Sequence, residues 1–186
     1  MIELLFIRHG ATAGNLQRRY IGRTDEPLCP AGLDQAEALG ALHLQADRLI
    51  VSPLLRARQT AAIAFPGQEM SLEPGFAETD FGIFEGKNAD ELADCPAYRA
   101  WVDTGCQGPI PGGEAVSDFK ARCCAAFAAR MQTLPEGCRA ALVVHGGVIM
   151  AICEAYALPR RDFYSYHLPN GGLLRARYKG GTLTIL

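Results

Sequence analysis

The strongest constraint on the fold is a nearly continuous apolar run at residues 2–7, which ends directly at Arg8 and His9. A run of this kind, without alternating polar positions, is typical of a strand that is covered on both faces. Shorter apolar runs at 49–51 and 140–144 have the same character. Such strands predict a sheet with helices packed on either side.

Segments with helical periodicity lie between these strands. Ser52 followed by Pro53 is a typical pair of N-cap and first helical residue, so a helix is predicted to begin there. Gly146 and Gly147 follow the strand at 140–144 and open another helical segment. The predicted helices cover residues 31–44, 52–64, 96–103, 116–131 and 146–156. Further strands are expected at 70–72, 173–178 and 182–186, the last two as a hairpin.

The alternation of strands with helices predicts an α/β domain with a mainly parallel sheet. The length of 186 residues fits one domain of ordinary size. The sequence contains no internal repeat, low-complexity tract or linker-like stretch. We therefore expect a single domain over residues 1–186.

Composition and charge exclude several classes of protein. The chain is 49% hydrophobic and 20% charged, which is a normal balance for a globular protein. A formal net charge of -2 lacks the basic field that general nucleic-acid or membrane-surface binders need. No segment is long enough to span a bilayer, and the N-terminal run is too short for a signal peptide. We expect a cytoplasmic protein without nucleic-acid or membrane partners; whether it forms a homodimer stays open.

The seven cysteines do not form a recognisable metal or redox motif. They occupy positions 29, 95, 106, 123, 124, 138 and 153. No two of them have the C-x-x-C spacing, and their number is odd. We therefore expect reduced thiols that act as small apolar packing residues.

Polar side chains follow three of the predicted strands at the point where each strand ends. Arg8 and His9 follow the first strand. Arg56 lies one helical turn beyond the end of the second, and His145 follows the last parallel strand. Ligands of open parallel sheets bind beyond the carboxyl ends of the strands. We therefore expect two imidazoles and two guanidinium groups to gather at one edge of the sheet.

This combination of groups is suited to binding a phosphoryl group. Two planar guanidinium forks can clamp the oxygens of one phosphoryl group. The helix N-termini predicted at Ser52 and Gly146 add backbone donors and favourable dipoles. Positive charge nearby disfavours imidazolium, so a histidine beside two arginines stays neutral and can act as a nucleophile. Each residue alone is more often an ordinary surface residue, but their joint occurrence on successive strand ends favours an active site.

Five motifs in order carry a family resemblance: LFIRHGATAGN, SPLLRARQTA, FAETDFGIFEG, PGGEA and VVHGG. They resemble the motifs of the histidine phosphatase superfamily, also called phosphoglycerate-mutase-like, and they span residues 2–149. The motif RHG alone is weakly specific, whereas the complete ordered set is highly specific. The resemblance implies a phosphoglycerate-mutase-like fold, which is a three-layer α/β/α sandwich with a mainly parallel central sheet.

The resemblance also implies roles for individual residues. His9 matches the nucleophile that becomes phosphohistidine, and Glu78 matches the proton donor to the leaving oxygen. Asn15 and Gly22 match positions that line the substrate entrance. The implied phosphate pocket consists of Arg8, Arg56, His145 and the backbone of Gly146.

The implied reaction is hydrolysis of a small phosphate monoester without a metal or other cofactor. The arginines supply the positive charge and align the phosphoryl group with His9, which is most of what phosphoryl transfer requires. Glu78 protonates the departing oxygen and then activates water, a contribution of roughly 10²–10⁴-fold. A zinc hydrolase that uses His9 and His145 is disfavoured, because no third ligand stands in a recognisable motif.

Several other polar residues near these motifs are interpreted as bystanders. Asp80, Glu85 and Glu114 are carboxylates that compete with Glu78 for the acid–base role. The match to the family pattern favours Glu78, and the latter two rivals are interpreted as structural. His167 is interpreted as an ordinary side chain, although the Pro-Asn-Gly-Gly sequence that soon follows it leaves contact with substrate open.

The segment DFGIFEGKNADEL distinguishes between members of the family. It resembles the phosphatase branch, above all α-ribazole phosphatases, which remove the 5′-phosphate of the lower-ligand nucleoside in cobalamin synthesis. Broad-specificity sugar-phosphate phosphatases and fructose-2,6-bisphosphatase-like proteins have similar segments, and the former stay an alternative. The short region after Glu78 disfavours a phosphoglycerate mutase, and the presence of all pocket residues disfavours a non-catalytic phospho-ligand binder.

Overall fold

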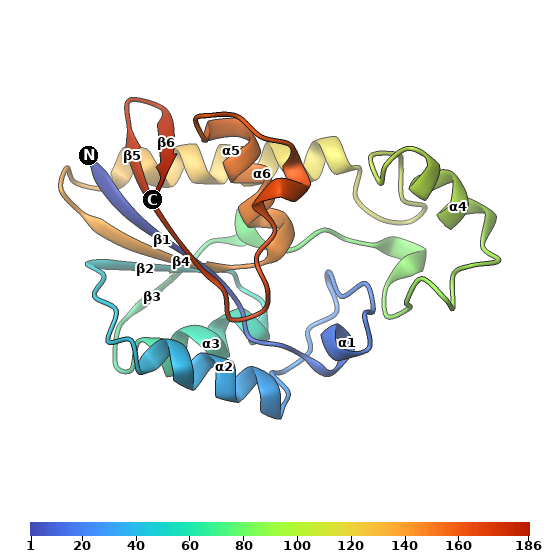
Figure 1. The fold of residues 1–186 in the computed structure, drawn as a ribbon, viewed down its shortest axis with the longest axis horizontal. Coiled ribbons are helices and arrows are strands. Elements are labelled where there is room, and N and C mark those ends of the chain that lie inside the picture. Colours follow the sequence, from blue (N-terminus) through green and yellow to red (C-terminus); the bar gives the residue numbers. More distant parts are fainter.

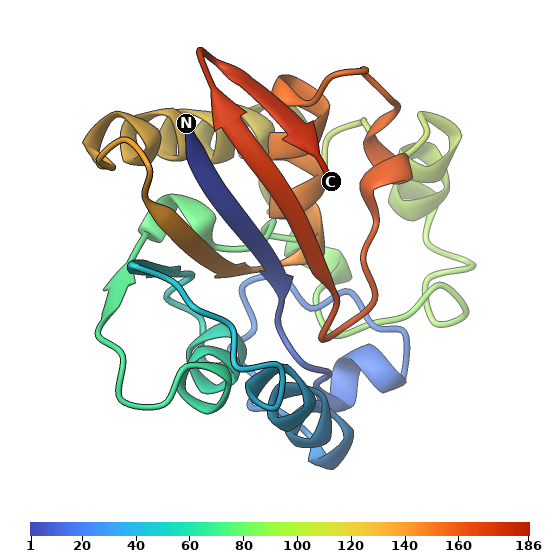
Figure 2. The ribbon, with the colours of Figure 1, turned by 60° about the vertical axis from the view of Figure 1, so that its left-hand side comes forward.

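The computed structural model describes residues 1–186 and contains one six-stranded sheet in the order β3-β2-β4-β1-β5-β6 (Figure 1). Its strands are β1 (Ile2–Arg8), β2 (Arg48–Val51), β3 (Met70–Leu72), β4 (Arg139–Val144), β5 (Leu173–Lys179) and β6 (Thr182–Ile185). The strands from β3 to β1 pair in parallel, whereas β5 pairs antiparallel with both β1 and β6. Figure 2 shows the β5–β6 hairpin beside β1. The mainly parallel sheet and the terminal hairpin are confirmed.

Helices cover both faces of the sheet, which confirms the predicted three-layer sandwich. One layer contains α2 and α3, and the opposite layer contains α5 and α6 (Figure 1). The α-helices are α1 (Ala13–Leu16), α2 (Pro30–Gly40), α3 (Leu55–Ala64), α4 (Pro96–Asp103), α5 (Val116–Thr133) and α6 (Gly146–Tyr156). Short 3₁₀ helices are η1 (Pro74–Phe76), η2 (Gly82–Phe84) and η3 (Phe163–Tyr166). None of the helices combines the length and hydrophobicity that a membrane span requires.

Two cores on opposite faces of the sheet explain the nearly continuous apolar run of β1. Leu4 and Phe6 belong to a cluster of 22 buried residues that includes side chains of α5 and α6. Leu5 and Ile7 belong to a cluster of 11 buried residues that includes side chains of α2 and α3. Successive side chains of a strand point to opposite faces, so the centre of a strand between two helical layers has no position suited to a polar residue.

The helix predicted at 31–44 is shorter than expected. It ends at Gly40, and Leu42, which lies within the predicted range, is 57% exposed. His43 adopts a left-handed conformation with φ of 48°, which is incompatible with a continuing helix and turns the chain toward β2. The periodic spacing of apolar residues therefore extended beyond the true end of the helix.

The helix predicted to begin at Ser52 begins instead at Leu55. Ser52 does not cap the helix, because its Oγ lies 2.6 Å from Nε2 of His145. The carboxylate of Asp25 accepts a hydrogen bond from the backbone N–H of Leu55 at 2.6 Å instead. The predicted start at Ser52 is thus wrong, and Asp25 occupies the first N–H of the observed helix. That this helix end adds donors to the site stays a prediction.

The segment around α4 forms a third, smaller apolar cluster that projects to one side of the sheet (Figure 1). Tyr20 and Phe81 pack against this cluster. These two residues come from the loops after β1 and after η1, so the cluster attaches α4 to loops beyond the carboxyl ends of the strands. Its buried members are Phe84, Leu92, Tyr98, Trp101 and Ile110.

The seven cysteines are free thiols. Cys123, Cys138 and Cys153 are buried, and burial raises the pKa of the Cys153 thiol to about 12. The predicted role of apolar packing is confirmed for these three residues. The other four cysteines are partly exposed.

Candidate active site

The carboxyl ends of β1, β2 and β4 bring the predicted side chains together. Arg8 of β1 lies opposite Val144 of β4, so the residues that follow these strands are neighbours. The rings of His9 and His145 have centroids 5.0 Å apart and planes inclined by 62°. Nε of Arg56 lies 3.3 Å from Nε2 of His9. The predicted convergence of these side chains is confirmed, while their roles stay predictions.

His9 is held in one tautomer. Its ring is buried, and its Nδ1 lies 2.7 Å from the carbonyl oxygen of Gly10. A carbonyl oxygen only accepts hydrogen bonds, so Nδ1 carries the proton and Nε2 keeps a lone pair that faces Nε of Arg56. Burial, followed by the charge of Arg56, lowers the pKa of His9 well below its usual value. The imidazole is therefore neutral at neutral pH, and burial contributes more to this than the arginines that were predicted to cause it.

Arg56 is completely buried, and its guanidinium is fixed by backbone carbonyls. Nη1 donates to Thr24 at 2.8 Å, and Nη2 donates to Gly22 at 2.8 Å and to Ile21 at 3.3 Å. These bonds leave Nε directed at His9. Gly22 was predicted to line the substrate entrance, but the structure places its carbonyl behind Arg56 and not among the cavity-lining residues described below.

The loop that holds Arg56 is itself held by Glu85. The Glu85 carboxylate accepts hydrogen bonds from the backbone N–H groups of Gly22 at 3.1 Å and Arg23 at 2.8 Å, and from the hydroxyl of Thr24 at 2.8 Å. Glu85 therefore acts on the site through the backbone of this loop. Its interpretation as a structural residue agrees with this geometry.

His145 is buried and has one ring nitrogen without a partner. Its Nε2 lies 2.6 Å from Oγ of Ser52, whereas its Nδ1 is buried and forms no hydrogen bond. Burial, followed by the charge of Arg56 and the neighbouring His9, lowers the pKa of His145 well below its usual value. When the Ser52 hydroxyl donates to Nε2, the single proton of the neutral ring lies on Nδ1, where it can be donated to a bound anion.

Arg8 extends from the end of β1 toward the start of α6. Its Nη1 donates to the carbonyl oxygen of Leu168 at 2.6 Å and lies 3.1 Å from Nε2 of His167. Its Nε is buried without a hydrogen-bond partner. A Cβ added to Gly146 would lie 3.4 Å from Cζ of Arg8, so the guanidinium lies against the first residue of α6. His167, interpreted from the sequence as an ordinary side chain, thus adjoins the site.

Glu78 lies at the N-terminus of α6. Its Oε2 accepts a hydrogen bond from the backbone N–H of Gly147 at 3.1 Å, and its Oε1 accepts one from Thr79 at 3.0 Å. A side chain at position 147 would collide with Oε1, so this second glycine of the HGG motif makes room for the carboxylate. These two N–H groups fix the side chain of Glu78 at the start of α6.

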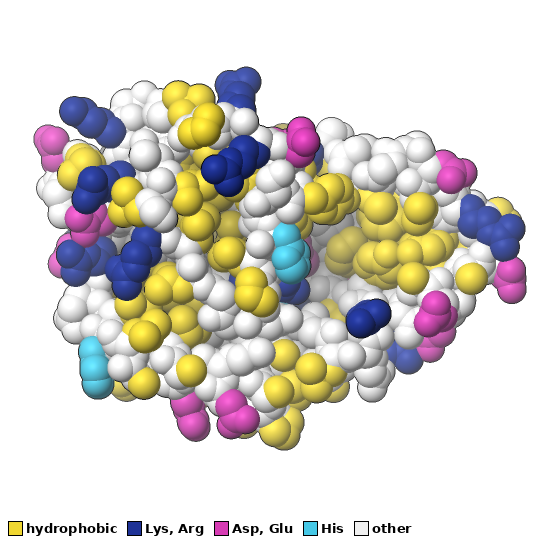
Figure 3. Space-filling view, viewed as in Figure 1, with side chains coloured by type: hydrophobic (Ala, Val, Ile, Leu, Met, Phe, Trp, Pro, Cys, Tyr) yellow, Lys and Arg dark blue, Asp and Glu magenta, His cyan; other side chains and the backbone are white.

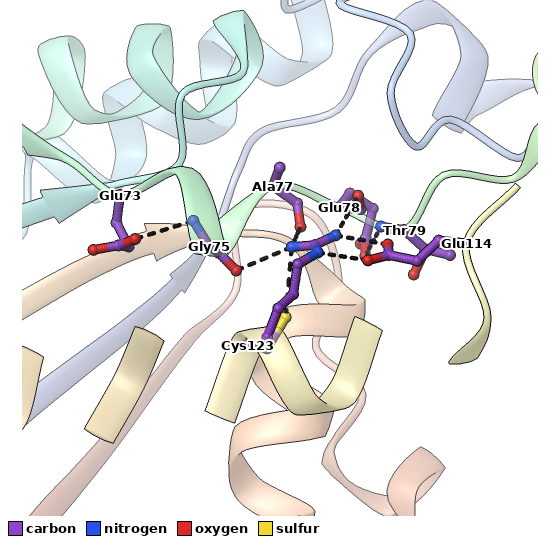
Figure 4. A network of polar contacts seen from close by, with 8 residues as sticks. Glu73, Gly75, Ala77, Glu78, Thr79, Glu114 and Cys123 are labelled. Carbon is purple, nitrogen blue, oxygen red and sulfur yellow. Dashed lines mark hydrogen bonds and ion pairs between the residues drawn. The ribbon is translucent and has the colours of Figure 1, made fainter. Parts of the chain in front are cut away.

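Arg122 of α5 holds the backbone around Glu78. Figure 4 labels the residues that its guanidinium contacts, among them Gly75, Ala77, Glu78 and Glu114. Its Nη1 donates to the carbonyl oxygens of Gly75 at 3.0 Å and Ala77 at 2.8 Å, and its Nη2 donates to that of Glu78 at 3.1 Å. The Glu114 carboxylate accepts from Nε at 2.6 Å and from Nη2 at 2.8 Å. Glu114 is therefore structural, as interpreted. Arg122 was not singled out, because no local pattern reveals bonds to carbonyls more than 40 residues away in the chain.

Arg122→Leu is expected to lower the free energy of unfolding by about 3 kcal/mol, because the Glu114 carboxylate and three carbonyl oxygens lose their hydrogen-bond donors. The Arg122 and Glu114 side chains are only 24% and 14% exposed, so water cannot fully replace the lost donors. Urea denaturation measures the effect. Arg99→Leu is the matched control, since it breaks an exposed ion pair with Asp94 and should change stability far less. Equal losses in the two variants would contradict this account.

Asn15 links three segments near the site. Its Oδ1 accepts a hydrogen bond from the backbone N–H of Thr12 at 3.2 Å, which caps α1, and another from Nδ2 of Asn170 at 3.1 Å. Nδ2 of Asn170 also donates to the carbonyl oxygen of His9 at 3.2 Å. Asn15 lines the cavity, in keeping with its predicted place at the entrance. Asn170 was not singled out as a site residue, although it lies in the Pro-Asn-Gly-Gly sequence.

A cavity of about 350 Å³ opens beside Arg8 and Glu78. Of the predicted site residues, Arg8, Asn15, Glu78 and Gly146 line it. Eleven of its twenty lining residues are hydrophobic. Figure 3 shows hydrophobic side chains gathered in the hollow between the α4 segment and the body of the protein. The cavity therefore combines a charged end with a largely apolar wall.

The charged end of the site is suited to a tetrahedral anion. Two guanidinium groups, an unpaired imidazole nitrogen and the start of α6 can donate to its oxygens. The neutral imidazole of His9 stands beside them with an unprotonated Nε2. No group of three or more His, Cys, Asp or Glu side chains is placed to hold a metal ion. Such an arrangement can bind a phosphoryl group and attack its phosphorus atom.

Comparison with known proteins gives a family match and several similar relatives. The model of the histidine phosphatase superfamily (branch 1) matches residues 4–186. The protein named probable phosphoglycerate mutase GpmB from Enterobacter sp. (strain 638) is 36% identical over 152 residues, which cover 78% of this chain and 70% of the relative.

Solved structures are similar over nearly the whole chain. The α-ribazole phosphatase from Shigella flexneri has a TM-score of 0.88 and 25% identity, covering 99% of this chain and 94% of the other. The phosphoglycerate mutase from Thermus thermophilus has a TM-score of 0.76 and 32% identity, covering 99% of this chain and 96% of the other.

Proposed function

The chain belongs to the histidine phosphatase superfamily, and we propose that within this family it is a phosphatase that hydrolyses a phosphate monoester through phosphohistidine at His9. The observation that carries the proposal is the state of His9. Its Nδ1–H is held by the carbonyl of Gly10, which leaves Nε2 unprotonated, with its lone pair facing Nε of Arg56 at 3.3 Å. A neutral, oriented imidazole is the form of histidine that acts as a nucleophile.

In the first step, the phosphoryl group is bound between Arg8, Arg56 and the Nδ1–H of His145. Nε2 of His9 forms a bond to phosphorus while the bond from phosphorus to the leaving oxygen breaks. The carboxylic acid of Glu78 gives its proton to that oxygen, so the leaving group departs as a neutral alcohol. The guanidinium groups neutralise the remaining phosphoryl oxygens, and no metal is required for this charge stabilisation.

In the second step, water takes the place of the leaving group. The carboxylate of Glu78 accepts a proton from water as the water oxygen bonds to phosphorus. The bond between phosphorus and Nε2 of His9 breaks, and inorganic phosphate is released. Glu78 is protonated again at the end of the cycle and ready for the next substrate.

We further propose α-ribazole 5′-phosphate as the substrate. The likeness to the Shigella flexneri protein named α-ribazole phosphatase covers nearly the whole chain and supports this choice. The largely hydrophobic cavity also supports it, because a nucleoside carries a flat base that such a wall can bury. Phosphoglycerate mutase is the second candidate, supported by the names of the Enterobacter and Thermus relatives. Broad-specificity sugar-phosphate hydrolysis is the third.

A substrate panel tests the proposal. The panel contains α-ribazole 5′-phosphate, sugar phosphates, both phosphoglycerates and nucleotides, each assayed with and without EDTA and ranked by kcat/KM. We expect hydrolysis that EDTA does not reduce, an acid-labile phosphoenzyme in quenched reactions, and the highest kcat/KM for α-ribazole 5′-phosphate. Interconversion of phosphoglycerates that depends on a bisphosphorylated primer and exceeds hydrolysis would identify a mutase instead. A protein that binds these compounds and hydrolyses none of them would overturn the proposal.

A further inference from the structure

The wall of the cavity is built from aromatic side chains of separate segments. Tyr20 follows β1, Phe81 precedes η2, Trp101 belongs to α4, and Tyr164 belongs to η3. These segments are far apart in the sequence, yet their rings line one space beside Arg8 and Glu78. A cavity with such walls buries a flat apolar group well, because aromatic rings offer large, rigid contact surfaces.

Trp101 has a buried polar atom that lacks a partner. Its side chain is 5% exposed and stands against Tyr20 with ring centroids 5.6 Å apart and planes at 82°. Its Nε1 forms no hydrogen bond. A buried donor without an acceptor destabilises the folded protein, and native structures contain few of them.

Three buried side-chain nitrogens in the protein lack a hydrogen-bond partner, and all three belong to this site. They are Nε of Arg8, Nδ1 of His145 and Nε1 of Trp101. The first two lie at the anion site, where phosphoryl oxygens can accept from them. The third belongs to Trp101, whose side chain lines the adjoining cavity, where the remainder of the substrate would lie beside it.

The charges of the cavity limit what that remainder can be. Arg8 and Glu78 serve the reacting phosphoryl group. Arg19 also lines the cavity, but its guanidinium is bound to both carboxylate oxygens of Glu91, at 2.7 and 2.8 Å, and to the carbonyl of Gly86. No cation is therefore free for a carboxylate or a second phosphate on the leaving group. An uncharged leaving group fits the cavity best.

We propose that this cavity is a subsite for a leaving group with a flat aromatic ring system, and that Nε1–H of Trp101 donates a hydrogen bond to an acceptor atom on that ring system. The inference rests on the proposed phosphatase function and deepens it by assigning a specificity-determining residue. Trp101 selects among phosphate esters, whereas His9 and the arginines act on all of them.

Trp101→Phe tests the hydrogen bond, because phenylalanine keeps an aromatic face and removes the N–H. The substrates are 2-naphthyl phosphate and a set of quinolyl phosphates that differ from naphthyl phosphates by one ring nitrogen at successive positions. For each substrate, kcat/KM of the variant is divided by that of the wild type, which cancels the intrinsic reactivity of the leaving group. For one or more quinolyl isomers, we expect this ratio of kcat/KM values to be about tenfold lower than for the naphthyl ester. The same ratio for every isomer and for the naphthyl ester would overturn the assignment of Trp101.

Tyr98→Phe is the matched control. Tyr98 belongs to the same aromatic cluster, and its hydroxyl binds that of Tyr20 at 2.8 Å, but it does not line the cavity. This variant removes a polar atom close to Trp101 without touching the proposed acceptor. In Tyr98→Phe, the ratio of kcat/KM for each quinolyl phosphate to kcat/KM for naphthyl phosphate should equal the wild-type ratio. A change in this ratio as large as that in Trp101→Phe would show that general loosening of the aromatic cluster is responsible.

The wild-type protein tests the aromatic subsite without any variant. Competitive inhibition by benzylphosphonate is compared with inhibition by 3-phosphonopropionate, since both bring a phosphonate to the anion site and neither is hydrolysed. Burial of the phenyl ring should make benzylphosphonate roughly tenfold or more the stronger inhibitor. Stronger inhibition by the carboxylate compound would overturn the subsite. Failure of the proposed function itself is distinguishable, because no phosphate ester would then be hydrolysed at all.

Discussion

His9→Ala is expected to abolish measurable hydrolysis of phosphate monoesters, with kcat falling on the order of 10⁵-fold or more. The variant lacks the lone pair that the carbonyl of Gly10 and Nε of Arg56 orient in the wild type. Without Nε2 of His9 the protein has no atom that can accept the phosphoryl group, so the phosphoenzyme cannot form. Reactions with ³²P-labelled substrate, quenched in alkali, should give labelled wild type and unlabelled variant.

The loss must be separated from unfolding, because His9 is buried. Arg8, Arg56 and His145 stay in place in a folded variant, so it should still bind inorganic phosphate or vanadate in a calorimetric titration. His43→Ala is the matched control, since His43 is exposed and lies outside the site. It should retain turnover and labelling. Alkali-stable labelling of His9→Ala, or turnover above about one hundredth of the wild-type rate, would refute the role of His9.

The parts of the fold that were predictable are those in which one pattern has one physical cause. The run at residues 2–7 carries apolar side chains on both faces, because α2 and α3 cover one face and α5 and α6 cover the other. The convergence of His9 and His145 was predictable for a related reason. Parallel neighbours end at the same edge of a sheet, and both residues directly follow such strands.

Ser52 shows how a local signal is overridden by a distant partner. Serine followed by proline favours a helix start, and in an isolated peptide that preference would decide. In the folded chain, its hydroxyl is instead within hydrogen-bond distance of His145, 93 residues later. The helix begins three residues further on, and Asp25 from yet another loop supplies its first acceptor. A hydrogen bond between side chains of two different strand ends cannot be predicted from the sequence neighbours of either residue.

Arg122 and Trp101 were out of reach for the same reason, whereas contact of His167 with substrate was left open from the Pro-Asn-Gly-Gly sequence that follows it. Each of the three residues contacts segments that are distant in the sequence. Arginine on a helix is ordinarily solvated, and tryptophan in a short helix is ordinarily part of a core. Only the arrangement of loops around the sheet edge shows that one fixes the Glu78 backbone and that another lines the cavity.

Glu78→Gln is expected to reduce kcat/KM by roughly 10²–10⁴-fold for esters of alcohols such as glycerol phosphate. Glutamine cannot give a proton to the leaving oxygen, and an alkoxide is too basic to depart without one. For p-nitrophenyl phosphate the expected loss in kcat/KM is less than about tenfold, because nitrophenolate departs unprotonated. The ratio of the two losses thus measures proton transfer from Glu78 rather than general damage to the site.

The second step gives the same variant a further signature. Glutamine cannot accept a proton from water, so hydrolysis of phosphohistidine should become rate-limiting. With p-nitrophenyl phosphate, a stopped-flow trace should show a burst of nitrophenolate equal to the enzyme concentration, followed by slow turnover. Asp80→Asn is the matched control, because Asp80 is a nearby carboxylate that accepts from Gly82 and does not line the cavity. A Glu78→Gln trace without a burst, with equal losses for both esters, would assign the proton transfer to another group.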